Sequence, residues 1–498
     1  MPNFLPQFKQ PCPADFVLQL ADLTVLTCQK VVRVVPNKRV VCQALWQGKP
    51  VYAKLFFGKN ASKYAGRDAA GVKWLMEANI DTPRMLYQGE ATDESAPENI
   101  LNVLIFEAII PANNVEQVWQ DLNQNQNHRL ALATKIVAEV AKHHNAGLLQ
   151  TDLYLKNFLV SDDKIYTLDG DGIRKFAHLT SKQALQNLAV IWSKFDVLDI
   201  EKWQAILVDT YSAASTWKSD LEPVTLANMA NQHRQQVAGY YADKKVFRQC
   251  TDVNITAVRG LFIAASSHAN INMPANIVAL DALIQPHNLL KNGNTSTVAL
   301  AEFDNKKIVV KRYNIKSFWH GISRAFRPSR AAVSWANAHR LTILNIATAK
   351  PIALYEQRTF GLLGFNLRSR AYFLAEYLDI PDVTEYFAQT QDKTQRAEAV
   401  KNIVTLFYKL YLLQISHGDM KATNIKMRDT QPALIDLDSM RQHRKPNIAA
   451  HVRDLQRFMQ NWQNDNALYN AFVKTFKVVY PDDSMLIKAG IATNKEFI

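Results

Sequence analysis

The chain has few cysteines and no long apolar run. Its four cysteines, in 498 residues, form no Cys-x-x-Cys pair and no metal-binding spacing, which argues against a disulfide framework or a zinc site. No stretch approaches the length of a transmembrane helix. The first residues, MPNFLPQFKQPCP, lack the charged-then-apolar pattern of a signal peptide. We therefore expect a cytoplasmic protein with reduced thiols.

Acidic residues are scarcer than basic ones, and a common nucleotide-binding motif is missing. The chain has 45 Asp and Glu against 58 Lys and Arg, which gives a formal charge of +13. This charge favours an anionic partner, such as a nucleotide, an acidic lipid, a phosphosugar or a nucleic acid, and does not choose between them. The sequence Gly-x-x-x-x-Gly-Lys-Ser/Thr does not occur, which disfavours a P-loop NTPase.

One constellation of residues is present twice. The first copy, HNAGLLQTDLYLKNFLVSDDKIYTLDGDGIR, begins at His144, and the second, QISHGDMKATNIKMRDTQPALIDLDSMR, begins at Gln414. A chance match on solvated loops is disfavoured, because two copies share one register. Without a gap, the copies align Asp152 with Asp419, Asn157 with Asn424, Asp169 with Asp436, Asp171 with Asp438 and Arg174 with Arg441.

This spacing is typical of the catalytic core of a kinase-like phosphotransferase. Phosphoryl transfer needs a carboxylate that orients the attacking hydroxyl, here Asp152 or Asp419, and Mg²⁺ that holds the β- and γ-phosphates. An Asn amide and an Asp carboxylate supply the oxygen ligands that Mg²⁺ prefers. The residues between them read as a two-stranded hairpin, which would bring the second Asp back to the Asn. We therefore predict two pairs of metal ligands: Asn157 with Asp169, and Asn424 with Asp436.

Each half also carries a lysine upstream, at the end of a predicted β-hairpin. In RVVPNKRVVCQALWQGKPVYAKLFF the alternating pattern ends at Lys54, and in LLKNGNTSTVALAEFDNKKIVVKRYN it ends at Lys311. A lysine about a hundred residues before the catalytic Asp is typical of the strand lysine that grips the α- and β-phosphates in protein kinases. The stretch GNTST stands where a phosphate-covering loop would lie, so the candidate ATP-binding residues there are Gly293, Asn294 and Thr295.

A helical segment and an apolar strand follow each lysine. In AGRDAAGVKWLMEANIDTP, either Asp68 or Glu77 could pair with Lys54, and Asp68 is better placed; the plain alternative for Asp68 is a solvated helix face. SRAAVSWANAHRLTILN has no acidic residue, so another group must orient the second lysine. The strands VLIFEAII and YFLAEYLD place Glu107 and Glu376 at the hinge between two lobes, where adenine binds mainly to backbone groups.

Helices lead into and out of each Asp loop. Residues 129–143 and 397–413 have helical apolar spacing, and another helix follows soon after each second Asp. The long activation segment and Ala-Pro-Glu motif of protein kinases are absent, which favours a sugar or lipid head group over a protein as the acceptor. We expect an α+β fold of two tandem protein-kinase-like domains, each with a small β-rich N-lobe and a helical C-lobe. We place them at residues 1–250 and 251–498.

Both halves resemble the lipopolysaccharide core kinases of Gram-negative bacteria, the family of Kdo kinases and heptose kinases. The matching stretches are KRVVCQALWQGKPVYAKLF, LLQTDLYLKNFLV and LDGDGIR in the first half, and LLKNGNTSTV, VVKRYN, RAFRPSRAAVSWANAHRL, HGDMKATNIK and LIDLDSMR in the second. The resemblance implies a protein-kinase-like fold, ATP and Mg²⁺ as cofactors, and phosphorylation of an inner-core sugar at the cytoplasmic face of the inner membrane. One departure is Gln150, which stands where kinases and the second copy, with His417, have a histidine.

Two other classes of function stay open. A non-catalytic kinase-like scaffold could bind nucleotide or glycolipid and regulate envelope glycolipid assembly, but the full set of Lys, Asp, Asn and Asp in both halves favours an enzyme. A small-molecule antibiotic phosphotransferase usually has an acidic substrate pocket, whereas this chain is basic. The expected partners are a nucleotide and a lipopolysaccharide core glycolipid or related phosphosugar; we expect no nucleic acid.

A basic and aromatic segment precedes the helix of the second half. In KSFWHGISRAFRPSR, from Lys316 to Arg330, apolar residues recur every four positions beside four basic residues. Such a face is attracted to an anionic bilayer, so peripheral contact with the inner membrane is one interpretation. Packing of this face on the N-lobe, or direct contact of its arginines with substrate phosphates, are the alternatives.

Overall fold

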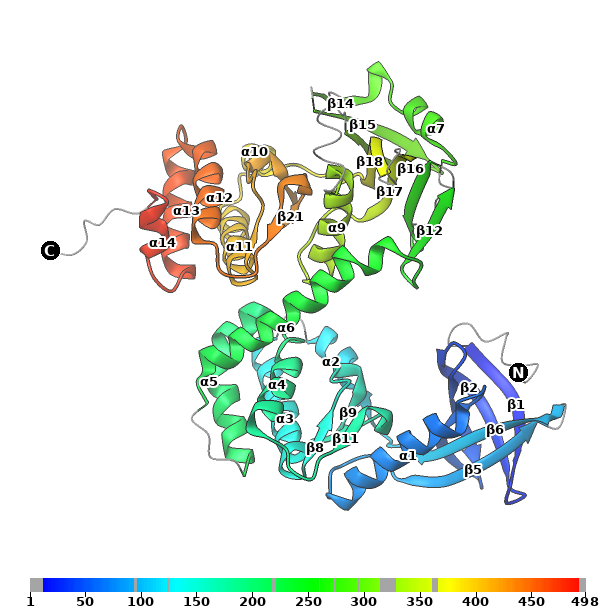
Figure 1. The fold of residues 1–498 in the computed structure, drawn as a ribbon. Helices are drawn as coiled ribbons and strands as arrows, with labels where there is room; N and C mark the ends of the chain where they lie inside the picture. The colour runs from blue at the N-terminus through cyan, green and yellow to red at the C-terminus, as the bar shows by residue number, and fades with distance from the viewer. Residues whose placement is uncertain are drawn as a thin grey trace. The chain divides into compact units, whose positions relative to one another are not determined.

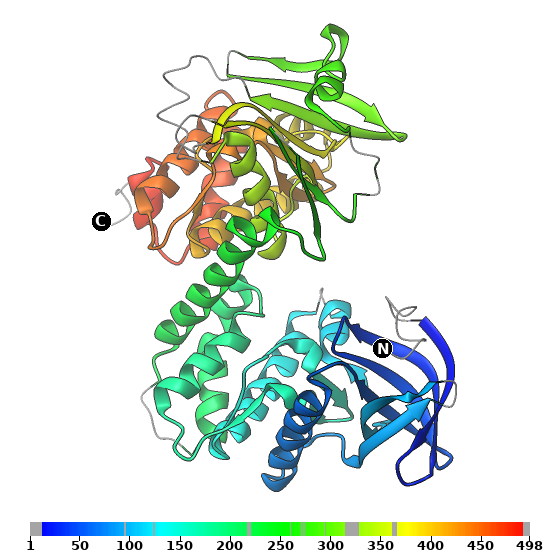
Figure 2. The same ribbon diagram turned by 45° about the vertical axis from the view of Figure 1, so that its right-hand side comes forward.

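The computed structural model describes most of the chain, which forms two compact units. The described residues are 12–93, 96–122, 125–216, 221–258, 260–269, 271, 274–293, 295–313, 328–360 and 366–491. The units are Met1–His233 and Arg234–Ile498, and each is described by itself. The division falls inside helix α6 (Pro223–Asp243), before the boundary that the sequence places after residue 250. Within each unit, strands gather in one part and helices in another (Figures 1 and 2).

Six strands of the first unit close into a barrel, in the order β1-β2-β3-β4-β6-β5. Apolar and polar residues alternate along them, so that Leu26, Cys28 and Val40 point inward and are fully buried. The predicted hairpin is present, because β3 and β4 pair from one end to the other across the turn at Gln47 and Gly48. The strands are β1 (Cys12–Leu20), β2 (Val25–Val35), β3 (Arg39–Trp46), β4 (Lys49–Phe56), β5 (Met85–Asp93) and β6 (Ala96–Glu107).

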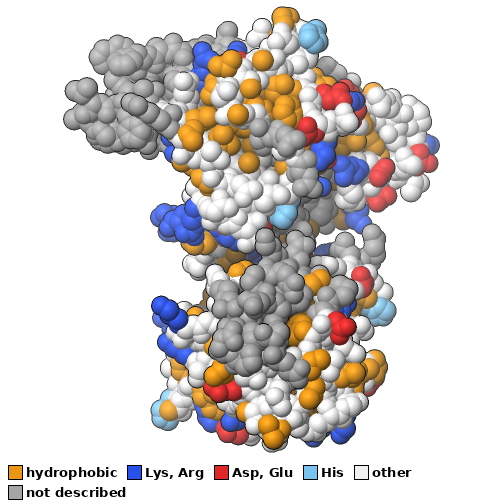
Figure 3. All heavy atoms as spheres, turned by 90° about the vertical axis from the view of Figure 1, so that its right-hand side faces the viewer, with side chains coloured by type: hydrophobic (Ala, Val, Ile, Leu, Met, Phe, Trp, Pro, Cys, Tyr) orange, Lys and Arg blue, Asp and Glu red, His pale blue; other side chains and the backbone are white. Residues whose placement is uncertain are grey.

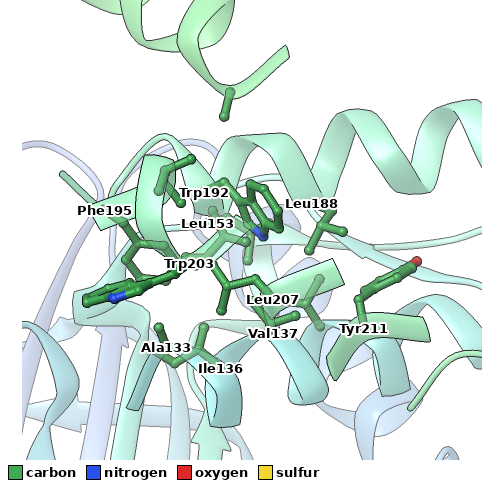
Figure 4. Packing of buried hydrophobic residues seen from close by; sticks show 14 of the residues in the cluster. Ala133, Ile136, Val137, Leu153, Leu188, Trp192, Phe195, Trp203, Leu207 and Tyr211 are labelled. Carbon is green, nitrogen blue, oxygen red and sulfur yellow. The ribbon is translucent and has the colours of Figure 1, made fainter. Parts of the chain in front are cut away.

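Helices make up most of the rest of the first unit. α1 packs on the barrel through Ala65 and Ala69, and the other helices enclose a separate core (Figure 4) in which Trp192, Trp203 and Leu207 are buried. The helices are α1 (Ala61–Glu77), α2 (Val115–Asp121), α3 (Gln126–Asn145), α4 (Ser181–Trp192), α5 (Val197–Ala214) and α6. Short strands accompany them: β7 (Asn113–Asn114), β8 (Leu148–Gln150), β9 (Phe158–Ser161), β10 (Lys164–Thr167) and β11 (Ile173–Lys175).

The second unit begins with a seven-stranded sheet in the order β12-β13-β17-β18-β16-β15-β14. α9 (Arg330–Ile343) packs on this sheet, with Trp335 fully buried beside Leu354. α7 (Ile277–Ala282) packs against the same sheet through Leu280. The strands are β12 (Val253–Val258), β13 (Leu261–Ser266), β14 (Leu289–Asn292), β15 (Ser296–Phe303), β16 (Lys306–Tyr313), β17 (Pro351–Phe360) and β18 (Asn366–Glu376).

The second unit ends in a helical part with an aromatic core. Phe458 and Phe472 meet edge to face, with ring centroids 5.0 Å apart, and Phe407 lies 5.0 Å from Phe458. The helices are α10 (Val383–Gln389), α11 (Lys393–Leu412), α12 (Ile448–Met459), α13 (Asn466–Val479) and α14 (Ser484–Lys488). The short strands are β19 (Ile415–Ser416), β20 (Ile425–Arg428), β21 (Gln431–Leu434) and β22 (Arg441–Gln442).

The mixture of helix and sheet predicted from the sequence is confirmed. The two expected hairpins after Asn157 and Asn424 are β9–β10 and β20–β21, and the helices expected before the Asp loops are α3 and α11. The helices expected after each second Asp are α4 and α12.

The surface of the second unit exposes many hydrophobic side chains on one face (Figure 3). Val258, Val278 and Leu290 are large exposed examples in its strand-rich part. Over the part of the chain that the structure describes, no helix is long and apolar enough to cross a membrane. Of the basic and aromatic segment that begins at Lys316, residues 316–327 lie outside the described residues, and Arg330 is the first residue of α9.

Candidate active site

The first unit places Lys54 between two carboxylates. β4 carries Lys54, whose Nζ lies 2.9 Å from Asp68 Oδ1 and 2.7 Å from Asp68 Oδ2. The same Nζ lies 3.3 Å from Asp169 Oδ1. The expected pairing of Lys54 with Asp68 is therefore present, whereas Glu77 lies near the end of α1 and pairs with Lys175 instead. The role of these residues in ATP binding stays a prediction.

The hairpin β9–β10 brings Asp169 back to Asn157, as its sequence suggested. The backbone N–H of Leu168 donates to the carbonyl of Asn157 at 2.8 Å, and Asn157 Nδ2 donates to the carbonyl of Asp152 at 2.7 Å. Asp169 itself has the left-handed backbone conformation, with φ of 65°. The three aligned residues of the first copy thus form one connected group.

Helix α1 approaches the loop after Asp169 very closely. A Cβ added at Gly71 would lie 2.0 Å from the carbonyl oxygen of Gly170, and one added at Gly170 would lie 2.2 Å from the carbonyl oxygen of Asp68. Only glycine allows two backbones to come so near. This contact fixes the distance between the carboxylate of Asp68 and that of Asp169.

A cavity of about 600 Å³ lies beside this group in the first unit. Lys54, Asn157 and Asp169 line it, together with apolar side chains such as Val41, Phe106, Ile109 and Leu159. Glu107 lines it as well, at the end of β6, but its carboxylate accepts from Arg84, with Nε at 2.9 Å from Oε2. Four of the residues predicted from the sequence, Lys54, Glu107, Asn157 and Asp169, therefore line one cavity of the size that ligand sites usually have, whereas Asp68 and Asp152 are not among its lining residues.

The second unit assembles the same residue types with different partners. Lys311 Nζ contacts Asp436 Oδ1, and it lies 2.7 Å from Asp438 Oδ2. Arg330 Nη2 also lies 3.0 Å from Asp438 Oδ2. Asp438 thus takes the place of the acidic residue that α9 lacks, and its carboxylate is the partner that orients Lys311. That carboxylate comes from a single 3₁₀ turn after β21, Leu437–Ser439, and not from α9.

Charge and burial have opposite effects on the pKa values of Lys311 and Asp169. Burial disfavours the charged form of Lys311, but Tyr313 and the two carboxylates outweigh it and raise the pKa of Lys311. Burial would raise the pKa of Asp169, but the charges of Lys54 and Arg39 hold that pKa well below its usual range. Lys311 and Asp169 are therefore both charged at neutral pH.

Asn424 joins Asp419 to Asp436 in the second unit. Its Nδ2 donates to the carbonyl of Asp419 at 2.8 Å, and its own carbonyl accepts the N–H of Ile435 at 3.0 Å. Two cations lie beside the exposed side of the Asp419 carboxylate: Lys421 Nζ at 3.1 Å and Arg457 Nε at 3.6 Å. Asp419 thus lies at a position where an acceptor with negative charge would meet positive side chains.

The other predicted ATP-binding residues of the second unit lie along the chain between β14 and β15 and at the end of β18. Gly293 donates its N–H to the carbonyl of Ser296 at 3.0 Å and so closes the turn between β14 and β15, where Thr295 is exposed. Asn294 lies outside the described residues. Glu376 ends β18, and its N–H donates to the carbonyl of Lys350 at 2.9 Å. Their assignment to ATP binding stays a prediction.

Gln150 and His417 make the same contact in the two units. Gln150 Nε2 donates to the carbonyl of Leu168 at 3.1 Å, and His417 Nε2 lies 3.0 Å from the carbonyl of Ile435. Leu168 and Ile435 are aligned residues, each directly before the second Asp. The glutamine of the first copy therefore preserves the loop geometry, although it replaces a histidine.

Two residues that support these loops were not identified from the sequence. In the second unit, α12 carries Asp454, whose Oδ2 accepts the N–H of His417 at 2.6 Å. The aligned residue in the first unit is Asn187 of α4, whose Nδ2 donates to the carbonyl of Gln150 at 2.9 Å. Extending the gapless alignment of the two copies by thirteen residues would have paired them.

The donor atoms of the second unit fit a magnesium ion. Asn424 Nδ2 donates to the carbonyl of Asp419, so the side-chain oxygen of Asn424, Oδ1, is the atom left for a metal. Asp436 contacts Lys311 through only one of its two carboxylate oxygens. Among the described residues, no group of three or more His, Cys, Asp or Glu forms a metal cluster, so such a site would also use oxygens of the nucleotide and water. In the first unit, both oxygens of Asp169 already accept from cations.

The histidine pair before the first loop belongs to the core. His143 Nε2 lies 2.9 Å from Thr167 Oγ1, and His144 Nδ1 lies 2.8 Å from the hydroxyl of Tyr211. Burial lowers the pKa of His143 to about 3 and that of His144 to about 4. Both side chains are thus neutral packing residues.

Comparison with known proteins gives the family. The model of the lipopolysaccharide kinase (Kdo/WaaP) family matches residues 60–205 and 284–480, which together exceed half of the chain. No curated protein matches the chain. A solved structure of WaaP in complex with acyl carrier protein is similar to this chain at 16% sequence identity, over 43% of this chain and 90% of that one, with a TM-score of 0.32. The chain therefore belongs to the lipopolysaccharide kinase (Kdo/WaaP) family, whose model matches it in two separate segments.

Proposed function

We propose that this chain is an ATP-dependent phosphotransferase that transfers the γ-phosphate to a hydroxyl of a lipopolysaccharide core sugar. In this proposal each unit is a protein-kinase-like domain, whose strand-rich part is the N-lobe and whose helical part is the C-lobe. Family membership supports a kinase role in lipopolysaccharide core biosynthesis. The observation that carries the finer proposal is the connected set of Lys311, Asp419, Asn424 and Asp436 in the second unit.

Each of these residues has a separate role in the proposal. Asp419 orients the attacking hydroxyl and accepts its proton, since its carboxylate is partly exposed beside Lys421. Lys311 releases a carboxylate to bind the α- and β-phosphates of ATP. Asn424 and Asp436 would hold Mg²⁺, which when bound neutralises the charge of the β- and γ-phosphates. Lys421 and Arg457, next to Asp419, favour an acceptor that carries negative charge.

Contact with the inner membrane stays part of the proposal on sequence grounds alone. Residues 316–327 lie outside the described part of the chain, and only the end of the basic segment can be placed. There, Arg330 contacts Asp438 beside Lys311, so this arginine belongs to the candidate active site. For the other arginines of the segment, Arg324 and Arg327, which lie outside the described residues, contact with a bilayer or with substrate phosphates stays a proposal from the sequence.

Phosphoryl transfer to purified core glycolipid tests the proposal. The chain is incubated with γ-labelled ATP, Mg²⁺ and glycolipid, and label in the glycolipid is measured for the wild type and for the double variant Asp152→Ala, Asp419→Ala. We expect transfer by the wild type and a loss of about 10²–10⁴-fold in the double variant. If the wild type transfers no label to any core acceptor, the alternative of a non-catalytic kinase-like scaffold that binds nucleotide or glycolipid is the better account.

A further inference from the structure

Arg39 makes the first unit chemically different from the second. It begins β3, is only 4% exposed, and lies against both carboxylates of the Lys54 group. Its Nη1 lies 3.1 Å from Asp68 Oδ2, and its Nη2 lies 2.8 Å from Asp169 Oδ2. A guanidinium does not lose its charge in proteins, so this positive charge is a fixed part of the site.

The second unit has a small neutral residue at the same place. Arg39 pairs with Phe56 across the hairpin, two residues after Lys54. In the second unit, Ser296 begins β15 and pairs with Tyr313, two residues after Lys311. The register of the two hairpins thus identifies Ser296 as the counterpart of Arg39.

The carboxylates of the first unit are therefore surrounded by excess positive charge. Asp171 is paired as well, with Lys38 Nζ at 2.7 Å from its Oδ2 and with Arg67. The ion pairs of this cluster thus join three carboxylates, on residues 68, 169 and 171, to four cations, on residues 38, 39, 54 and 67. In the described part of the second unit, Asp436 and Asp438 pair with two cations.

This cluster does not fit a magnesium ion at Asp169. Mg²⁺ requires oxygen ligands at about 2.0–2.1 Å in near-octahedral geometry. Both oxygens of Asp169 already accept from Arg39 and Lys54, and Arg39 is held in place from its other side by Asp68. A divalent cation bound there would also lie next to a buried guanidinium and be repelled by it.

The cavity beside the cluster has the chemistry of a nucleotide site. Four cations line it, Arg33, Arg39, Lys54 and Lys156, against the two acidic residues Glu107 and Asp169. Arginine and lysine are the side chains that bind phosphate oxygens directly. The remaining lining is largely apolar, which suits a nucleoside base and makes a nucleotide a better occupant than free pyrophosphate.

We propose that the first unit binds the phosphates of an adenine nucleotide with its own cations, led by Arg39 and Lys54, and without a divalent metal. The identity of the ligand as a nucleotide rests on the proposed function, whereas metal independence rests on Arg39 and Lys54, which occupy both carboxylate oxygens of Asp169. Phosphoryl transfer in this fold relies on metal to neutralise the γ-phosphate. The first unit is therefore a binding module, and transfer belongs to the second.

Nucleotide titration in EDTA tests this proposal without any transfer reaction. Binding of ADP to the full-length wild type is measured by calorimetry in excess EDTA and again in MgCl₂. We expect one site in EDTA, which Lys54→Met removes and Lys311→Met leaves. In the Lys311→Met variant, the affinity for ADP in EDTA should agree with the affinity in MgCl₂ within about threefold. In the Lys54→Met variant, ADP should bind at least about tenfold more weakly in EDTA than in MgCl₂. Pyrophosphate in EDTA should bind at least about tenfold more weakly than ADP.

Two substitutions at one position separate the role of Arg39 from a loss of folding. In the Lys311→Met chain, Arg39→Lys keeps the charge and should keep binding in EDTA, whereas Arg39→Ser, which copies Ser296, should lose it by at least about tenfold. Circular dichroism and the Tm of each variant report whether it folds. The proposal is overturned if the wild type binds no ADP in EDTA, if Lys311→Met rather than Lys54→Met removes that binding, or if pyrophosphate binds as well as ADP.

Discussion

The carboxylate of Asp454 holds the backbone of His417 in place. Asp454 is buried at 3% exposure on α12, and its Oδ2 lies 2.6 Å from the N–H of His417 while its Oδ1 lies 2.9 Å from the N–H of Gly418. Burial raises the pKa of Asp454, against the effect of these two bonds. Both bonds end at the turn immediately before Asp419, so a helix far along the chain positions the proposed base.

Removal of this carboxylate should destabilise the second unit. Asp454→Ala removes the acceptor of two N–H groups, on His417, which is buried, and on Gly418, and we expect the free energy of unfolding to fall by about 3 kcal/mol. Asp454→Asn is the matched control, because it keeps one oxygen acceptor and should lose less than the alanine variant. Urea unfolding measures both. An alanine variant as stable as the wild type would show that the two bonds do not hold the loop.

The shared contact of Gln150 and His417 predicts which substitutions the second loop tolerates. The side chain of Gln150 donates to the carbonyl of Leu168, the residue before Asp169. The side chain of His417 makes the same contact with the carbonyl of Ile435, the residue before Asp436. We therefore expect His417→Gln to keep phosphoryl transfer within about tenfold, whereas His417→Ala should lose more, since the partly buried carbonyl of Ile435 then lacks its donor. Equal loss in both variants would mean that the imidazole has a role other than this hydrogen bond.

Two glycines on helix α1 should respond in opposite ways to alanine. At Gly71 a Cβ would lie 2.0 Å from the carbonyl oxygen of Gly170, whereas at Gly66, which is exposed, it would meet nothing within 4 Å. Gly71→Ala should therefore destabilise the first unit by about 3 kcal/mol through overpacking. Gly66→Ala should stabilise it by about 0.5–1 kcal/mol, because alanine restricts the unfolded chain. Thermal unfolding of the two variants measures the contrast, and a Gly71→Ala protein with unchanged Tm would contradict the close contact.

The stability of the chain should fall in mild acid because of buried neutral histidines. Burial lowers the pKa of His451 from 6.5 to about 4, and its Nε2 lies 2.8 Å from the hydroxyl of Tyr480. In the unfolded chain His451 binds a proton as the pH falls below about 6.5, whereas in the folded chain it stays neutral down to about pH 4. The free energy of unfolding therefore decreases as the pH falls between these values. For this residue the loss at pH 5 is about 2 kcal/mol.

His451→Gln removes this titration while keeping a polar side chain that can reach Tyr480. The difference in the free energy of unfolding between pH 7 and pH 5 should then be smaller than in the wild type by about 2 kcal/mol. Urea unfolding at the two pH values measures it. If both proteins lose the same stability between pH 7 and pH 5, His451 is not kept neutral by its surroundings.

The sequence predicted the parts of the site that depend on local order. Because a hairpin of known length joins Asn157 to Asp169, their proximity followed from spacing alone, and alternation placed Lys54 at the end of a strand. The family resemblance, drawn from the same stretches, is confirmed. Residue roles and the binding of ATP and Mg²⁺ stay predictions.

The partners of the charged groups could not be predicted, because they depend on tertiary approach. Asp438 aligns with Asp171 in the sequence, yet their partners differ. Asp438 pairs with Lys311, whereas Asp171 pairs with Lys38 and Arg67. Arg39 is one more residue of an alternating strand in the sequence, and only the approach of α1 and of the loop after β10 shows that it lies between the carboxylates of Asp68 and Asp169. Differences between the halves thus arise at positions that no local pattern marks.

Phosphoryl transfer by two single variants tests the central claim, that the second unit performs the chemistry. Asp419→Ala and Asp152→Ala are compared with the wild type under saturating Mg²⁺ and ATP, with core glycolipid as acceptor. Because Asp419 lies beside a donor set that fits Mg²⁺ and Asp152 beside one filled by cations, Asp419→Ala should lower turnover by about 10²–10⁴-fold and Asp152→Ala by less than about threefold. Nucleotide binding should persist in both. A large loss in Asp152→Ala, with Asp419→Ala close to the wild type, would contradict the account.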